Sequence, residues 1–427
     1  MVMNLFHHDS NFYIPKKNKI VGEFMDTINL STFIGRSYSF QFPKKIIFRV
    51  GSSESVGLEA KALGGSRVLL VTDKNLMQLS SIKEIERTLL RENLNVEVFS
   101  DVEAEPNIEV ANKIAEFARN GAYDLIIGVG GGSVLDMAKV ASIALTNPGP
   151  IRKYVGVNLV ERPGAPKILI PTTAGTGSEV TNVAVITLLD EEAKSAIISP
   201  YMLSDVAIVD PKLTYTMPRK ITASTGLDAL SHALEALMAV NANPLTDALA
   251  LQAIRIIVEC LPKAYKNGDA ESRFGMSLGS LMAGMAFANS WVCLGHALAY
   301  SFSVTYKVPH GVSCGLSLPY AFKFNMPVIQ HRIWDIAEAM GLFKEIENKE
   351  KNLGNLILSK LLNLLSDLNM PMRLKDIGVP ENDIDKIASK LLTFTRLIQR
   401  NPRKVSEREA HNLIMEMWSG LTIGAYA

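Results

Sequence analysis

The sequence predicts an α/β fold with a parallel sheet in the first half of the chain and an all-helical second half. Continuous apolar runs alternate with helical patterns between residues 67 and 173, which is typical of parallel strands buried on both faces. After about residue 215 strand-like runs nearly vanish and long helical patterns dominate. A chain of 427 residues is also long enough for two packed domains. We therefore expect an N-terminal extension over residues 1–38, an α/β domain over 39–215 and a helical domain over 216–427.

Strand and helix patterns alternate regularly in the α/β half. The run RVLLVTD is apolar until its terminal carboxylate, and the segment after it carries Ile82, Ile85 and Leu89 at helical spacing. This βαβ alternation favours a parallel sheet with right-handed crossovers. We expect a strand or hairpin in SFQFPKKIIFRVG, strands at 67–73, 95–101, 124–133 and 167–173, and helices at 81–93, 108–120 and 134–145.

The second half is predicted to be helical over 222–240, 246–264, 276–303 and much of 345–420. Residues 274–306 contain no Asp, Glu, Lys or Arg, and a stretch of this length could span a bilayer. It nevertheless contains Asn289 and His296, and nothing else in the chain resembles a second span. We therefore expect one fully buried helix of a large domain.

Composition excludes several classes of partner. Lys plus Arg is 44 and Asp plus Glu is 43, so there is no electrostatic footprint for nucleic acid or an anionic membrane. The cysteines, Cys260, Cys293 and Cys314, are odd in number and lack CxxC spacing. We interpret them as small buried apolar residues in a reducing cytoplasm. The N-terminus lacks the apolar region of a signal peptide. Because the charge balance is near neutral, the expected partners are small molecules or further copies of the chain.

A glycine turn follows one of the expected strands. Gly131, Gly132 and Ser133 come directly after DLIIGVG and directly before a helical pattern. Glycine lets the backbone approach a phosphate, and the helix N-terminus offers free N–H groups and a positive dipole end. The motif therefore predicts a site for the pyrophosphate of a dinucleotide, although it is not a GxGxxG fingerprint and a tight strand–helix turn would look the same.

Two further strand ends carry polar groups. PTTAGTGS, residues 171–178, follows a strand and offers hydroxyls where an open α/β sheet places its ligands. Asp73 ends the strand RVLLVTD, and a carboxylate there can bind ribose hydroxyls and repel a 2′-phosphate, which favours NAD over NADP. The alternative role of Asp73 is to cap a helix.

The strongest chemical signal lies in the helical half. Asp228 and His232 are spaced i and i+4 in TGLDALSHALEAL, so they share one helix face. His296 lies in the uncharged stretch and His310 in the segment VPHGVSCG. One Asp and three His form a plausible ligand set for a divalent transition metal. Such a metal would act as a Lewis acid on an alcohol or aldehyde oxygen while hydride passes to or from a nicotinamide.

Six ordered motifs give the chain a family resemblance. GGGSVLDMAK, PTTAGTGSEVT, DPKLTYTMP, TGLDALSHALEA, GHALAY and VPHGVSCGLSLPY together resemble the iron-dependent (group III) alcohol dehydrogenases, the family of lactaldehyde reductase and 1,3-propanediol dehydrogenase. The resemblance runs from about residue 39 to the C-terminus. It implies a dehydroquinate synthase-like architecture, in which an α/β dinucleotide-binding domain precedes a helical metal-binding domain and a cleft lies between them.

The resemblance also implies a set of functional residues. The metal, iron(II) in most of the family and zinc in some relatives, would be bound by Asp228, His232, His296 and His310. The residues expected to bind NAD are Asp73, Asn107, Gly131, Gly132, Ser133, Asp136, Thr172, Thr173, Thr176, Val185 and Lys194. The family further implies a homodimer or larger homo-oligomer.

The chain departs from the family at two points. Many relatives carry a second His one turn after the third ligand, where this chain has Tyr300. Tyr300 is therefore the candidate for acid–base catalysis beside the metal ligands, with water or the cofactor ribose as alternative proton carriers. The alternative for Tyr300 itself is a structural role as a core aromatic residue. The first 38 residues also precede the usual family start.

The predicted reaction is hydride transfer between NAD(H) and a small primary alcohol or aldehyde. Hydroxyacid-oxoacid transhydrogenation and glycerol dehydrogenase-like polyol oxidation remain as alternatives, because they use the same architecture. A non-catalytic relative is disfavoured by the intact set of four metal-ligand residues. Phe287 and Trp291 are expected to line the pocket, which favours a short, apolar or lightly hydroxylated substrate.

Overall fold

The computed structural model describes residues 35–347 and 352–421. The chain divides into two compact units, residues 1–39 and 40–427. The predicted extension over residues 1–38 therefore lies almost entirely outside the described residues, and the fold described below is that of the second unit.

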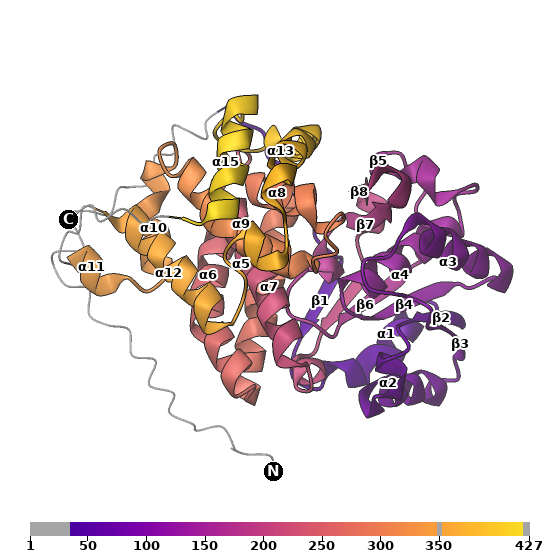
Figure 1. The fold of residues 1–427 in the computed structure, drawn as a ribbon. Helices are drawn as coiled ribbons and strands as arrows, with labels where there is room; N and C mark the ends of the chain where they lie inside the picture. The colour runs from indigo at the N-terminus through magenta and orange to yellow at the C-terminus, as the bar shows by residue number, and fades with distance from the viewer. Residues whose placement is uncertain (1–34, 348–351, 422–427) are drawn as a thin grey trace, which may run out of the picture. The chain divides into compact units, whose positions relative to one another are not determined.

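The first part of this unit is built on two sheets (Figure 1). The strands are β1 (Lys45–Phe48), β2 (Arg67–Val71), β3 (Asn95–Phe99), β4 (Leu125–Gly130), β5 (Gly156–Val157), β6 (Lys167–Pro171), β7 (Val183–Leu188), β8 (Ala193–Ile198) and β9 (Val206–Val209). Six of them form a parallel sheet in the order β1-β9-β6-β4-β2-β3. The small second sheet has the order β5-β8-β7, in which β7 and β8 form an antiparallel pair.

Helices cover both faces of the large sheet because its central strands are apolar on both sides. Val68 and Leu70 of β2 pack in one core with α1 (Val56–Ala62) and α2 (Ser80–Arg91). Leu69 and Val71 point the other way, into a core with α3 (Ile108–Gly121) and α4 (Gly132–Ala144). This two-sided burial is what the continuous apolar runs predicted.

The register of the sheet brings two sequence motifs together. Gly130, the last residue of β4, pairs directly with Pro171, the last residue of β6. The glycine turn that begins with Gly131 and the threonine-rich turn that begins with Thr172 therefore leave the same edge of the sheet side by side.

The rest of the unit is helical, which confirms the predicted fold class. Helix α5 lies at its centre and packs against α6, α7 and α9. The helices are α5 (Arg219–Met238), α6 (Pro244–Lys266), α7 (Ala270–Ser290), α8 (Leu294–Ser303), α9 (His310–Asn325), α10 (Gln330–Ala339), α11 (Phe343–Glu347), α12 (Leu353–Asp367), α13 (Ile384–Thr393), α14 (Thr395–Ile398) and α15 (Glu407–Ser419).

The prediction of one continuous buried helix over residues 276–303 is wrong. Helix α7 ends at Ser290, α8 begins at Leu294, and the two are bent by 100°. The buried Glu235 carboxylate explains the break, because its Oε2 accepts the backbone N–H of Cys293 at 2.7 Å and that of His296 at 3.3 Å. A carboxylate at this point satisfies free N–H groups and favours a new helix N-terminus.

Among the described residues, no single helix is both long enough and apolar enough to cross a membrane, and only the bent pair α7–α8 reaches that length and composition together.

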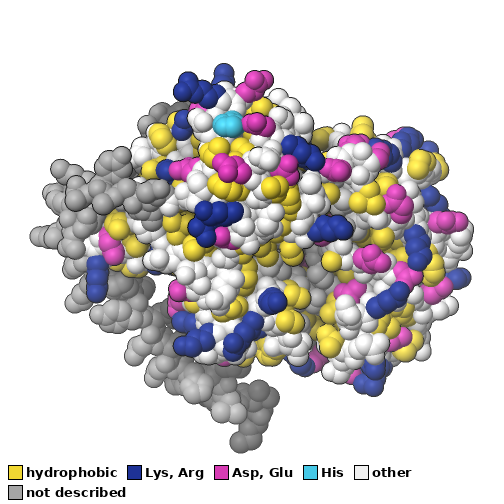
Figure 2. Space-filling view, viewed as in Figure 1, with side chains coloured by type: hydrophobic (Ala, Val, Ile, Leu, Met, Phe, Trp, Pro, Cys, Tyr) yellow, Lys and Arg dark blue, Asp and Glu magenta, His cyan; other side chains and the backbone are white. Residues whose placement is uncertain are grey.

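The visible surface carries charges of both signs among apolar side chains. In Figure 2 the dark blue and magenta side chains are interspersed over both the sheet-containing and the helical parts. The described residues also form surface ion pairs, such as Lys113 with Asp101 at 2.6 Å and Lys153 with Glu161 at 2.8 Å. The near-neutral charge balance is therefore distributed on this face rather than segregated.

Candidate active site

Four side chains predicted to bind a metal lie together at the centre of the helical part. Asp228 and His232 come from α5, His296 from α8 and His310 from the first residue of α9. The Oδ1 atom of Asp228 lies 3.7 Å from the Nε2 atoms of His232 and His296 and 3.5 Å from that of His310. Within the part of the chain that the structure describes, this buried oxygen has no hydrogen-bond partner. Three imidazoles thus converge on a buried, unsatisfied carboxylate oxygen.

The hydrogen bonds of two imidazoles determine which ring nitrogens are free. The Nδ1 atom of His232 lies 3.2 Å from the carbonyl oxygen of Gly175, and that of His296 lies 2.6 Å from Glu235 Oε1. Both partners are acceptors, so each Nδ1 donates and each Nε2 presents a lone pair. The two Nε2 atoms face each other at 3.1 Å. Two acceptors cannot bond to each other, so this geometry fits a shared cation.

Burial acts to lower the pKa of all three imidazoles. It holds the pKa of His310 well below its usual value and also lowers the pKa of His232. For His296 burial likewise acts to lower the pKa, but the charge and the hydrogen bond of Glu235, together with the charge of Asp228, raise the pKa overall. Metals bind the neutral imidazole, and a carboxylate on the second ring nitrogen fixes the ring and increases its basicity.

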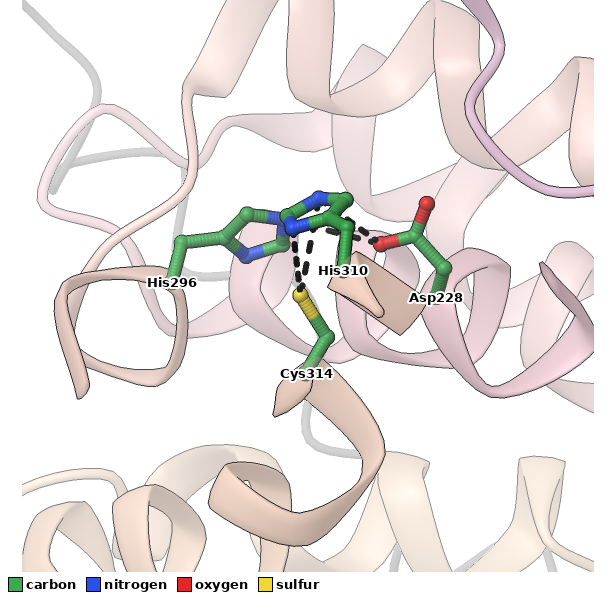
Figure 3. A group of neighbouring side chains, drawn as sticks. All are labelled: Asp228, His296, His310 and Cys314. Atoms are coloured by element: carbon green, nitrogen blue, oxygen red, sulfur yellow. Dashed lines mark hydrogen bonds and ion pairs between the residues drawn. The ribbon is translucent and has the colours of Figure 1, made fainter. Parts of the chain in front are cut away.

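Cys314 is a fifth candidate donor that the sequence interpretation missed. It lies one turn after His310 on α9, and its Sγ atom is 3.6 Å from both ring nitrogens of that residue. Figure 3 shows the thiol and the side chains of Asp228, His296 and His310 pointing toward one another. One ligand atom from each of these four residues lies within 4.8 Å of all the others. The spacing i and i+4 in HGVSC was the available signal, and it was read only as small-residue packing.

A cavity of about 370 Å³ opens above this cluster. Its walls come from the carboxyl edge of the large sheet, from β7 and β8, and from helices α5, α7, α8 and α14. Eight of the residues predicted to bind the cofactor line it: Gly131, Gly132, Ser133, Asp136, Thr173, Thr176, Val185 and Lys194. The candidate metal ligands Asp228, His232, His296 and His310 line the same cavity.

The glycine turn is shaped for close approach of a ligand. Gly131 is extended and α4 begins at Gly132 without a side-chain cap, so its first N–H groups are available. A Cβ atom on Gly132 would lie 2.6 Å from Thr176 Cγ2, so a side chain there would crowd the neighbouring turn. Asp136 is already used by the protein, since its Oδ1 accepts from Ser178 Oγ at 2.6 Å and its Oδ2 from the Val185 N–H at 2.9 Å.

Three predicted cofactor residues are not among those lining the cavity. Asp73 Oδ1 accepts the N–H groups of Asn75 at 2.8 Å and Leu76 at 2.9 Å, so its carboxylate is used within the turn that follows β2. Asn107 caps α3 by accepting the Val110 N–H at 3.0 Å. Thr172 is buried at the end of β6.

Aromatic side chains form the wall nearest the cluster. Phe287 stacks on the ring of His232, with centroids 4.1 Å apart, and Trp291 also lines the cavity, as predicted. The ring of Tyr300 is perpendicular to that of His296 and lies 5.5 Å from that of His310. Burial raises the pKa of Tyr300, so its hydroxyl keeps its proton at neutral pH.

Charged residues that the sequence analysis did not single out also line the cavity. Glu105 accepts the backbone N–H of His310 at 2.8 Å through Oε1, and its Oε2 pairs with Lys194 Nζ at 3.3 Å. Arg396 of α14 lines the cavity near Tyr300. Nothing in the local sequence pattern marks these residues, because they reach the site only through tertiary folding.

Comparison with known proteins gives the same family for both halves of the chain. The family model described as iron-containing alcohol dehydrogenase matches residues 43–211, and the model of the C-terminal part of the Fe-containing alcohol dehydrogenase family matches residues 222–418. Long-chain-alcohol dehydrogenase 1 of Geobacillus thermodenitrificans is 38% identical over 381 residues, which cover 87% of this chain and 95% of that protein.

Solved structures agree with the sequence comparisons. A crystal structure of 1,3-propanediol oxidoreductase superposes with a TM-score of 0.84 at 35% identity, covering 90% of this chain and 100% of that one. A structure of sulfoacetaldehyde reductase from Bifidobacterium kashiwanohense in complex with NAD+ superposes with a TM-score of 0.79 at 30% identity, with 90% and 100% coverage.

Proposed function

The chain belongs to the iron-containing alcohol dehydrogenase family, and on this premise we propose how its cavity carries out the family's reaction. The chain is an NAD-dependent alcohol dehydrogenase that transfers hydride between NAD(H) and an alcohol or aldehyde. The observation that carries the proposal is the convergence of three imidazoles on the buried Asp228 at the floor of a cavity that also contains the glycine turn.

We propose that Asp228, His232, His296 and His310 hold the catalytic metal. A divalent iron ion held there would act as a Lewis acid at the substrate oxygen. The facing lone pairs of His232 and His296 and the unsatisfied Asp228 oxygen support this assignment. Zinc binds nitrogen and oxygen ligands more tightly than iron(II), so the purified chain is expected to carry zinc unless it is loaded with iron.

The second proposed site is that of the cofactor, over the adjacent turns at the edge of the large sheet. NAD supplies the hydride acceptor when it is bound. Gly131, Gly132 and Ser133 would present the free N–H groups of α4 to the pyrophosphate. Asp136, Thr173, Thr176, Val185 and Lys194 line the adjoining wall. Asp73, Asn107 and Thr172 remain proposed contacts to the more distant parts of the dinucleotide.

Tyr300 is proposed to act on the substrate oxygen as a hydrogen-bond donor. Its ring lies against His296 and His310, so the phenol reaches the wall of the cavity beside the cluster. Because burial raises its pKa, the hydroxyl donates rather than abstracts a proton at neutral pH. The aromatic neighbours Phe287 and Trp291 exclude water from the same wall.

Several finer features are proposed from the same reasoning. We place the boundary between the α/β and helical domains near residue 215, which is supported by the two family models that match on either side of it. We also propose a cytoplasmic enzyme that forms a homodimer or larger homo-oligomer, in line with the free cysteines and the family resemblance.

The test is NADH consumption by anaerobically iron-loaded protein on a panel of short aldehydes, with a chelator-treated control. Metal-dependent consumption on any aldehyde is expected, and the rank order of the panel identifies the substrate. Consumption that survives complete metal removal would contradict the proposal. Oxidation of a hydroxyacid at the expense of an oxoacid, with no net NADH change, would indicate the transhydrogenase instead.

A further inference from the structure

Arg396 stands out among the cavity residues because it is a cation in a mostly apolar wall. It lies on α14, which follows Phe394, and the ring of Phe394 packs edge-on against Tyr300. The side chain of Arg396 is partly buried and lines the cavity together with Tyr300 and Trp291. The candidate metal ligands His296 and His310 line the same cavity, so the guanidinium and the candidate metal centre share one space.

No carboxylate of the described residues pairs with this guanidinium. Over residues 35–347 and 352–421, Arg396 makes no side-chain hydrogen bond or ion pair to an acceptor. Its charged neighbour one turn on is another cation, Arg400, whose guanidinium lies 5.0 Å from the centre of the Trp291 ring. The other cation in the cavity, Lys194, is by contrast paired with Glu105 at 3.3 Å.

An unpaired cation in such a place is costly unless something else supplies the negative charge. Burial lowers the pKa of Arg396, and the nearby charge of Arg400 lowers it further. A guanidinium also offers donors in a fork that matches two oxygens of one anionic group. The cavity therefore contains half of an ion pair, and the missing half is an oxyanion with access to the cavity.

We propose that Arg396 binds a terminal oxyanion of the substrate, so that this enzyme acts on short aldehydes and alcohols that carry a carboxylate or a sulfonate at the far end. The inference rests on the proposed function, because it assigns the substrate class of the same cavity. It replaces the apolar or lightly hydroxylated substrate expected from the sequence with an anionic one.

The volume of the cavity limits the length of such a substrate. Arg396, Tyr300 and the candidate metal ligand His310 all line one cavity of about 370 Å³. A substrate that bridges the candidate metal ligands and the guanidinium within this volume is therefore a short one.

The experiment compares charged and neutral aldehydes of similar size with the iron-loaded holoenzyme. The pairs are 4-oxobutanoate against butanal for a carboxylate, and sulfoacetaldehyde against propanal for a sulfonate. The variants are Arg396→Gln, Arg396→Lys and, as a matched control, Arg408→Gln, which removes one exposed positive charge from α15. The readout is the ratio of kcat/KM between the charged and the neutral member of each pair, together with the KM for NADH.

We expect the wild type to prefer at least one charged aldehyde, and the pair that shows the preference identifies the oxyanion. Removing one partner of a buried charge pair should lower that ratio about 30-fold or more in Arg396→Gln, chiefly through KM. Arg396→Lys should retain part of the preference, since lysine keeps the charge but not the fork. Arg408→Gln should leave the ratio within about twofold, as expected for an exposed charge.

Three outcomes would overturn the inference. One is a wild type that prefers the neutral member of both pairs, and another is a ratio that Arg396→Gln leaves unchanged. The third is a KM for NADH that rises in Arg396→Gln by as much as the KM for the charged aldehyde. That result would assign the guanidinium to the cofactor phosphates. Failure of the proposed function is distinct, because no variant would then consume NADH on any of the four aldehydes.

Discussion

Glu235 is the residue on which the geometry of the cluster depends. Its carboxylate is fully buried and accepts three hydrogen bonds: from the ring of His296 and from the backbone N–H groups of Cys293 and His296. One side chain thus orients a candidate ligand and starts the helix that carries it. A buried carboxylate is costly alone, and these donors satisfy it.

Replacing Glu235 with Gln should weaken metal binding without removing any ligand. The amide cannot offer His296 the same negative acceptor, so the ring loses its preferred tautomer and some basicity. We expect metal affinity to fall about 10-fold to 100-fold, measured by competition with a chromogenic chelator. Glu259→Gln, which changes an exposed carboxylate on α6, is the control. An affinity equal to that of the wild type would show that Glu235 serves only the fold.

Cys314 should produce a distinct absorption band if it binds the metal when the chain is loaded with cobalt(II). Two ligands on one metal ion, with bonds of about 2.0–2.1 Å to nitrogen and 2.3 Å to sulfur and an angle of about 110° between them, lie about 3.6 Å apart. The distance from Cys314 Sγ to His310 Nε2 is 3.6 Å. We therefore expect a sulfur-to-cobalt charge-transfer band in the near ultraviolet that Cys314→Ser abolishes and Cys260→Ser retains. Identical spectra for the three proteins, each with cobalt bound, would exclude the thiol from the metal site.

The sequence could single out Asp228, His232, His296 and His310 because their type and spacing are visible in the chain, and the structure brings these four together. It could not reveal Glu235 or Arg396. Glu235 meets His296 across 61 positions of sequence, and Arg396 is reached through the packing of α14 against α8. For a charged residue within a helical pattern, the sequence alone predicts a solvent-exposed side chain.

At the scale of elements, prediction from the sequence fails most clearly for helix breaks and short strands. The segment 276–303 has an unbroken apolar pattern, yet it turns at Trp291, whose φ is 76°, because a carboxylate from another helix caps the next one. The strands β7, β8 and β9 were not predicted. The pair β7 and β8 has polar and half-buried positions among its apolar ones and forms an antiparallel hairpin beside the parallel sheet. The buried parallel strands β2, β4 and β6 were predictable because both of their faces are apolar.

The contact between the turn after β6 and helix α7 offers a test at this scale. Gly177 has a φ of +60°, and a Cβ atom there would lie 2.5 Å from the Cα atom of Gly284 on α7. Gly177→Ala should therefore destabilise the chain by about 1–2 kcal/mol for the left-handed backbone and by about 1–3 kcal/mol more for forcing the backbones apart. The measurement is the midpoint of urea unfolding.

A matched variant separates the two effects. Gly64 has a φ of +81° and nothing within 4 Å of a Cβ atom, so Gly64→Ala carries the backbone cost alone. Equal losses of stability in the two variants would mean that the turn and α7 can move apart without cost. A larger loss for Gly177→Ala is the expected result.

At the scale of the whole molecule, a buried polar seam lies where the turn over residues 178–180 meets both α4 and α7. Lys139 on α4 is fully buried, and its ammonium donates to Ser178 Oγ at 2.8 Å, Thr181 Oγ1 at 3.2 Å and the Val183 carbonyl at 2.7 Å. Glu179 is buried beside it on the turn that touches α7. This seam ties the cofactor side to the helical side, so its ionisation should affect the stability of the fold.

Glu179 makes that stability depend on pH in a defined direction. Burial raises its pKa from 4.5 to about 7, although the charge of Lys139 opposes the rise. Below pH 4.5 the carboxyl is protonated in both the folded and the unfolded chain, so it costs nothing. Between pH 4.5 and about 7 only the unfolded chain ionises, so stability falls as the pH rises through this window. Above pH 7 the full cost applies, up to about 3 kcal/mol.

Glu179→Gln removes this titration, so the difference in stability between the variant and the wild type should grow as the pH rises through the same window. We expect the variant to match the wild type near pH 4.5 and to unfold at a higher urea concentration at pH 7.5, because an uncharged amide in the seam has no ionised form to bury. Glu84→Gln, which changes an exposed surface carboxylate of α2, should follow the wild type at every pH. A wild type whose stability stays constant or rises from pH 4.5 to 7.5 relative to Glu179→Gln would mean that Lys139 holds Glu179 ionised throughout. The seam would then hold two ionised carboxylates near one buried ammonium, since Lys139 also lies 3.4 Å from Asp136 Oδ1.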